Sequence, residues 1–117
     1  MFINLTNHPS EKWGEEQLEA AHRYGEIVDL SFPIIEPTFT KDDIMFLVNE
    51  SIEAIKGFKE DDTVVHVMGE MTFTHNLVNA LKELGIICLA STTERKTSMT
   101  PDGKKISEFQ FVQFREY

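Results

Sequence analysis

The sequence predicts an α/β fold with a mainly parallel β-sheet, and two observations carry that prediction. Short apolar runs alternate with amphipathic segments over residues 2–90, which is the pattern of strands joined by helical crossovers. After residue 90 the pattern changes to two extended segments joined by a turn, which indicates a hairpin. We therefore expect about four parallel strands, a C-terminal antiparallel strand and three helices, in a single domain over residues 1–117.

The first half of the chain supplies two strands and two helices. Phe2–Thr6 is an apolar run typical of a strand, and Ser10 is placed to cap a helix over residues 11–24. Residues 27–32 predict a second strand. Thr40 then precedes a second helix, which has two aspartates in its first turn and a clean apolar stripe.

The second half supplies the strand that we expect at the centre of the sheet. Residues 63–68 are β-branched and almost continuously apolar, as in a strand buried on both faces. A helix over residues 73–84 and a strand over 86–90 follow. A turn at 101–103 leads to a last strand over 105–114, and its link to the preceding strand is too short for a helical crossover.

The order of the strands decides where a ligand would bind. Of the two common orders, we favour the one in which the third strand lies beside the first. The loops after these two strands then open together at the point where the connections change direction. Folds of this class bind their ligands there.

Composition excludes several classes of protein. A net charge of −9 argues against a protein that coats duplex DNA or long RNA. The single cysteine, Cys88, allows no internal disulfide and no cysteine-rich zinc site, and we expect it to be an inert core residue. No apolar run approaches the roughly 20 residues of a membrane span, and no signal peptide is recognisable. We expect a cytoplasmic protein that contacts no membrane.

Polar residues gather in three loops at the carboxyl ends of the predicted strands. The candidate ligand-binding and catalytic residues there are Asn7, His8, Ser10, Gly69, Glu70, Thr72, Thr74, Ser91, Thr92, Thr93 and Arg95. Two helix N-termini at the same edge would suit a phosphate, and an arginine could clamp it. We expect His8, Thr72 and Arg95 to meet in one cleft. The plainer alternative is that the hydroxyls only cap helices and that the histidine and the arginine have structural or solvated roles.

No cofactor or metal is expected. The chain has no serine nucleophile elbow, no Walker loop and no dinucleotide-binding glycine fingerprint. His66, Glu70 and His75 are the best candidates for a metal site, but their predicted positions do not make them converge. Trp13 could stack on a base, although its place on the helix stripe favours the core.

Two blocks resemble a known group of proteins. Residues 4–10 with Trp13, and residues 65–70 with Thr72 and Thr74, look like small single-domain CRISPR-associated proteins. These are similar to the Rossmann-like (CARF) domains that sense cyclic oligoadenylate and to the compact ring nucleases that degrade it. The resemblance implies a Rossmann-like fold, a homodimer, and a cyclic oligoadenylate site across the dimer axis. The absence of a recognisable effector domain favours a ring nuclease of antiviral defence, or a ligand sponge.

Three functions remain open. The first is a metal-independent phosphodiesterase in which a ribose 2′-hydroxyl attacks its own phosphate. His8 would then be the general acid or base, Arg95 would stabilise the phosphate, and Glu70 would orient a hydroxyl or act as a base. The second is a non-catalytic binder of the same ligand. The third is a Rossmann-like regulatory or protein-interaction module without a nucleotide ligand.

The last predicted strand also suggests how the protein assembles. Phe109, Phe111, Val112 and Phe114 follow each other so closely that we expect both faces of this strand to be apolar. A second subunit that covers one face would make a homodimer. The alternative is that the hairpin folds back over its own sheet.

Overall fold

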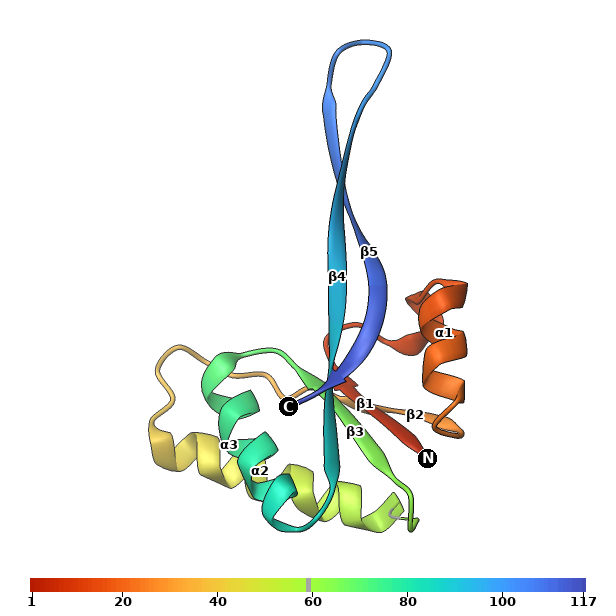
Figure 1. The fold of residues 1–117 in the computed structure, drawn as a ribbon. Helices are drawn as coiled ribbons and strands as arrows, with labels where there is room; N and C mark the ends of the chain where they lie inside the picture. The colour runs from red at the N-terminus through yellow and green to blue at the C-terminus, as the bar shows by residue number, and fades with distance from the viewer. Residues whose placement is uncertain (59) are drawn as a thin grey trace.

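The computed structural model describes residues 1–58 and 60–117 and confirms the α/β fold (Figure 1). Its elements in chain order are β1 (Phe2–Thr6), the 3₁₀ helix η1 (Ser10–Lys12), α1 (Glu15–His22), β2 (Ile27–Ser31), α2 (Lys41–Phe58), β3 (Val64–Met68), α3 (Met71–Glu83), β4 (Ile87–Met99) and β5 (Lys105–Glu116). None of the helices in these ranges is long and apolar enough to cross a membrane.

The strands of the described residues form one sheet in the order β2-β1-β3-β4-β5. The first four are parallel, and β5 is antiparallel to β4. The predicted order is confirmed, because β3 lies directly beside β1. Strand β3 is the middle strand of the five, as predicted, and all five residues of the neighbouring β1 are buried. The loops after β1 and β3 therefore open at the same edge of the sheet.

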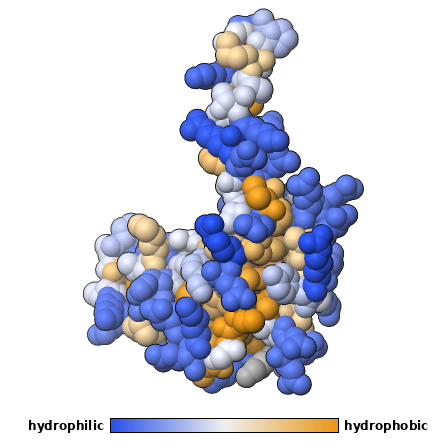
Figure 2. Space-filling model, in the orientation of Figure 1, coloured by the Kyte–Doolittle hydropathy of each residue, from blue (hydrophilic) through white to orange (hydrophobic). Residues whose placement is uncertain are grey.

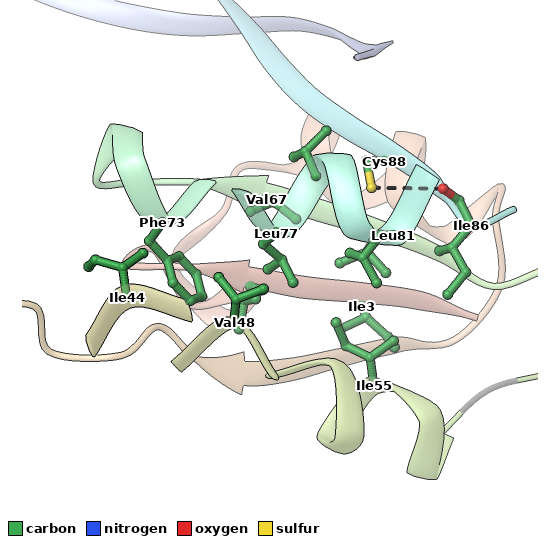
Figure 3. Packing of buried hydrophobic residues seen from close by; sticks show 13 residues of the cluster. Ile3, Ile44, Val48, Ile55, Val67, Phe73, Leu77, Leu81, Ile86 and Cys88 are labelled. Atoms are coloured by element: carbon green, nitrogen blue, oxygen red, sulfur yellow. Dashed lines mark hydrogen bonds between the residues drawn. The ribbon is translucent and has the colours of Figure 1, made fainter. Parts of the chain in front are cut away.

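The sheet separates two apolar cores, as expected of a three-layer Rossmann-like fold. Helices α2 and α3 cover one face and α1 covers the other (Figure 1). The larger core lies under α2 and α3, where Phe73, Leu77 and Leu81 of α3 are fully buried (Figure 3). Cys88 belongs to this core, and burial raises the pKa of its thiol to about 11.

The second core lies under α1 and is largely aromatic. Phe2 is at its centre, with the rings of Trp13 and Phe114 at centroid distances of 5.9 and 5.0 Å. Both partners come from outside the parallel sheet, one from the segment before α1 and the other from β5. This small core therefore fastens α1 and the hairpin to β1.

The helix starts differ from the prediction in two places. The helix expected over 11–24 is divided into η1 and α1, because Trp13 is extended between them and Gly14 begins α1 without a side-chain cap. The third helix begins at Met71, because the Glu70 carboxylate accepts hydrogen bonds from the amides of Thr72 and Phe73. The start of α2 is as predicted. The Thr40 hydroxyl accepts from the amide of Asp43, and the Asp43 carboxylate accepts from the amide of Thr40.

The hairpin is longer than predicted and leaves the body of the protein. Strand β4 pairs with β3 only over Ile87–Leu89, yet it pairs with β5 all the way to Met99. The outer part, residues 94–108, projects as a narrow two-stranded ribbon that we call the arm (Figures 1 and 2). Its sequence is mostly polar, and its two large apolar side chains, Met99 and Ile106, are exposed rather than packed in a core.

A bulge decides which side chains of the hairpin lie together. Opposite Thr92 and Thr93 the register skips Val112, so that Thr93 faces Phe111. Phe114, Phe111 and Phe109 therefore lie on the same side of the ribbon. In a strand without a bulge, Phe114 would lie on the opposite side from the other two, because side chains alternate. The aromatic face of the hairpin, as we call it, consists of these three phenylalanines with Thr93, Arg95 and Met99 of β4. The prediction that β5 is apolar on both faces is corrected for its three phenylalanines, which share one face.

We expect Gly69→Ala to destabilise the protein by about 1–3 kcal/mol. A Cβ at residue 69 would lie 2.3 Å from the ring of Phe32, which itself packs edge-on against Phe73. Gly57→Ala is the matched control, since nothing lies within 4 Å of its Cβ and alanine favours the helix. Urea unfolding measures both free energies. Equal stability of the two variants would contradict the steric argument.

Candidate functional site

A cleft of about 1010 Å³ opens at the carboxyl ends of β1 and β3, where the strand order predicts a site. Residues 6–8 and the start of the loop after β3 line its floor. One wall is the segment from Lys12 to Gln17, and the other is the base of the hairpin. The walls bring three aromatic side chains to the cleft, namely Trp13, Phe109 and Phe111.

Beneath the cleft, the side chain of Asn4 joins three strands. It is 1% exposed, and its Nδ2 donates to Oδ1 of Asp29 in β2 at 2.8 Å and to the main-chain carbonyl of His8 at 2.9 Å. Its Oδ1 accepts from the Thr6 hydroxyl at 3.0 Å and lies 3.0 Å from Nδ1 of His66 in β3. Because Nδ2 has two acceptors, Oδ1 is left for donors. Nδ1 of His66 therefore carries the proton.

The same network fastens the loop after β1. The amide and the hydroxyl of Ser10 donate to the Asp29 carboxylate at 3.1 and 2.7 Å, and the indole Nε1 of Trp13 donates to the carbonyl of His8 at 3.1 Å. Burial raises the pKa of Asp29, but hydrogen bonds from Asn4 and Ser10 outweigh it and lower the pKa below its usual value. An ionised Asp29 thus holds the loop in place.

His66 is the unusual member of this network. It is 2% exposed, and among the described residues its Nε2 has no hydrogen-bond partner. The rings of Phe2, Trp13 and Phe114 surround it at centroid distances of 5.8, 5.7 and 5.2 Å. Burial, with a contribution from the nearby charge of His8, lowers the pKa of His66 to about 4. At neutral pH the cleft therefore has an uncharged imidazole in its lining, with an unused acceptor.

The structure brings about half of the predicted site residues to the cleft. Those that line it are Asn7, His8, Gly69, Ser91 and Thr93. The lack of a side chain at residue 69 makes room for the ring of Phe32, rather than for a ligand close to the backbone.

The other candidates are engaged elsewhere. The Ser10 hydroxyl is bonded to Asp29, and the Thr92 hydroxyl donates to the carbonyl of Gln113. Arg95 donates to the hydroxyl of Ser107 on the arm. Thr74 lines a separate cavity of about 460 Å³ beside α3.

The loop after β3 is used to begin a helix. The Thr72 hydroxyl donates to the Glu70 carboxylate, and this bond, with the amides of Phe73 and Thr72, lowers the pKa of Glu70. The prediction that His8, Thr72 and Arg95 meet in one cleft is therefore wrong, since only the histidine lines it.

The sequence carries one further signal, which points to the buried network. Strands β1, β2 and β3 begin Phe-Ile-Asn, Ile-Val-Asp and Val-Val-His, so each has a polar residue at its third position. In the parallel register Asn4 lies between Asp29 and His66. Three such triplets in strands expected to be neighbours predict side chains that meet.

The lining favours rings and hydrogen-bond groups over a metal or a strong anion. No cluster of three or more potential metal ligands occurs in residues 1–58 and 60–117. The charged side chains in the lining are one ammonium, Lys12, and two carboxylates, Glu15 and Glu16. No side chain caps the first turn of α1, so its amides are free, but the same two carboxylates lie in that turn and would repel a phosphate.

Comparison with known proteins identifies a family for this chain. Residues 1–115 match the model of the Uncharacterized protein MJ1673 family. No curated protein and no solved structure matches the chain.

We expect the stability of the protein to fall by about 2 kcal/mol between pH 7 and pH 5 because of His66 alone. The pKa of this group is about 4 in the folded protein, against an ordinary value of 6.5. Below pH 6.5 the unfolded chain binds a proton that the folded protein refuses, so stability is lost until the folded group titrates as well.

Urea unfolding at several pH values measures this dependence. His66→Phe removes the titrating group, so the loss of stability between pH 7 and pH 5 should be smaller by about 2 kcal/mol. The exposed His75 gives the control, because His75→Gln should leave the dependence as it is. An unchanged pH dependence in His66→Phe would show that the buried imidazole is not the cause.

Proposed function

We propose that the cleft of this chain, which belongs to the Uncharacterized protein MJ1673 family, binds cyclic oligoadenylate in the cytoplasm. The ligand class comes from the resemblance to small CRISPR-associated proteins. The observation that carries the binding is the cleft itself, whose walls carry the rings of Trp13, Phe109 and Phe111.

Adenine matches these features chemically. Its face stacks on aromatic rings, and such stacking contributes about 1–3 kcal/mol per base. Its exocyclic amino group is a hydrogen-bond donor, which hydroxyl oxygens of the lining can accept. Trp13 and Phe111 supply rings on opposite walls, and the hydroxyls of Ser91 and Thr93 supply further hydrogen-bond groups. A cleft of about 1010 Å³ is large enough for more than one nucleoside.

The second half of the proposal is that the cleft also cleaves the ring. A ribose 2′-hydroxyl attacks the neighbouring phosphorus, the 5′-oxygen leaves and takes a proton, and the product has a 2′,3′-cyclic phosphate and a 5′-hydroxyl. Among the three catalytic candidates only His8 lines the cleft, so it is the group that moves the proton. Glu70 caps α3 and Arg95 lies on the arm, so neither has this role within one subunit.

A specific observation favours a second candidate function. Phe109 at the base of the arm is 72% exposed, and the net charge of −9 opposes the approach of a polyanion. Both are expected of a regulatory protein-interaction module. Such a module would use the arm and would leave the cleft without a nucleotide.

We expect cyclic oligoadenylate to raise the thermal midpoint by several degrees. A ligand at 100 times its dissociation constant adds about 2.7 kcal/mol to the stability of the folded state. Cyclic tetra- and hexaadenylate, a linear oligoadenylate and AMP form the panel, all in EDTA. Phe109→Ala should weaken binding about 5- to 150-fold, whereas Phe46→Ala, an exposed phenylalanine on α2, should not. A panel without any shift would favour the interaction module.

We expect His8→Ala to lower turnover about 100- to 10,000-fold while affinity changes by only a few fold. The reason is that proton transfer is needed in the transition state but not for binding. Chromatography of the products in EDTA measures turnover, and calorimetry measures affinity. An equal loss in both would make His8 a contact only. Tight binding by the unchanged protein with an intact ring after hours would select the non-catalytic binder.

A further inference from the structure

A second cavity lies beside α3, next to the point where β4 leaves the sheet. Strand β4 pairs with β3 only as far as Leu89 and then continues into the hairpin (Figure 1). Within the described residues, Val67 and Met68 at the end of β3 therefore have no strand paired to them on that edge. The cavity there measures about 460 Å³, which is in the usual range for a small-molecule site. Its lining consists of Met68, Gly69, Met71, Thr74, His75, Val78, Asn79, Lys82 and Tyr117.

Tyr117 takes the place of a strand at this edge. Its amide donates to the carbonyl of Cys88 at 3.1 Å, and its hydroxyl donates to the carbonyl of Val67. The side chain is thus held against β3 at both ends, and it forms part of the cavity wall. Two hydrogen bonds to the main chain fix this wall, so the cavity is formed before any ligand arrives.

The apolar part of the wall contains two thioethers that remain in contact with water. Met71 is 83% exposed and Met68 is 37% exposed, and both line the cavity together with Tyr117. Methionine side chains are flexible and polarisable, and their sulfur atoms make favourable contacts with aromatic rings. An aromatic ring in this cavity would shield both thioethers from water.

The polar part of the wall selects an anion. Among the described residues of the lining, Lys82 supplies an ammonium and His75 an imidazole, and no carboxylate side chain is present. The ammonium donates to the main-chain oxygen of Tyr117 at 3.3 Å, which uses one of its three N–H groups. The cleft, in contrast, has two carboxylates beside its ammonium. In a chain with a net charge of −9, this cavity is therefore the better place for a small anion.

We propose that the cavity beside α3 is a second small-molecule site, and that it takes an aromatic ring joined to a single anionic group. The ring lies against the two thioethers and Tyr117, and the anion accepts hydrogen bonds from the ammonium of Lys82. This chemistry has two sources, namely a mononucleotide and a small aromatic acid without a ribose. The site does not depend on the proposed function, because its occupant needs no contact with His8 or with the rings of the cleft.

The methionine methyl groups report on the site directly. The chain has five methionines, so selective isotope labelling of their methyl groups gives a simple NMR spectrum. Met71 lines the second cavity but not the cleft, Met68 lines both, and Met45 and Met99 line neither. A ligand in the second cavity therefore shifts the signals of Met71 and Met68. A ligand in the cleft shifts Met68 and the indole of Trp13 instead.

Phenyl phosphate is the probe that combines both halves of the chemistry. We expect it to shift Met71 and Met68 saturably at millimolar concentration or below. Inorganic phosphate and benzyl alcohol, which each supply one half, should bind about tenfold more weakly or worse. Lys82→Met should weaken the binding of phenyl phosphate about 5- to 10-fold, because a charged donor is lost at an exposed position. Lys56→Met removes the same charge from α2 and is the matched control, with unchanged binding expected.

Three results would overturn the proposal. These are the absence of any shift of Met71 with phenyl phosphate at millimolar concentration, equal binding of phenyl phosphate by Lys82→Met, and binding of benzyl alcohol as tight as that of phenyl phosphate. Adenosine 5′-monophosphate distinguishes the sources, since tighter binding than phenyl phosphate indicates a mononucleotide and weaker binding an aromatic acid. Failure of the proposed function is seen separately, because cyclic oligoadenylate would then leave the indole signal of Trp13 unchanged.

Discussion

The buried amide of Asn4 is the constraint on which the site depends. It lies in β1, and its hydrogen bonds reach β2, β3, the Thr6 hydroxyl of its own strand and the loop that forms the floor of the cleft. A register slip of one residue would turn this amide into the apolar core under α2 and α3, where it would have no partners. The network therefore fixes the strand register, the loop after β1 and the proton position on His66 together.

Much of the fold follows from the sequence because local and long-range signals agree there. The bounds of Phe2–Thr6 are as predicted, and the Thr40 cap and the strand order are confirmed. The predictions fail where a single residue interrupts a helix or shifts the alternation of side chains along a strand. Gly14 divides a helix, and the extra Val112 changes which side of β5 is apolar. A bulge depends on pairing with another strand, so periodicity within β5 cannot reveal it.

The candidate site was predictable in position but only partly in membership. The topology places the loops after β1 and β3 at one edge, and Asn7, His8 and Gly69 line the cleft for that reason. Hydroxyls and carboxylates beside a helix start can also be used by the helix itself, as Glu70 and Thr72 are. Sequence position alone does not separate these uses. Whether such a side chain caps its own helix or faces a ligand depends on which partner lies within a hydrogen-bond distance of about 3 Å.

The place of β1 in the sheet also sets an order of events during synthesis. Asn4 and His66 are 62 residues apart, and a chain growing from its N-terminus must make β2, α2 and most of β3 before β1 has both neighbours. Until then an apolar strand with at least one unpaired edge is exposed to other chains. The hairpin is made last and pairs locally, and local contacts form fastest. The nascent protein is thus most vulnerable to aggregation early in its synthesis, through its most buried strand.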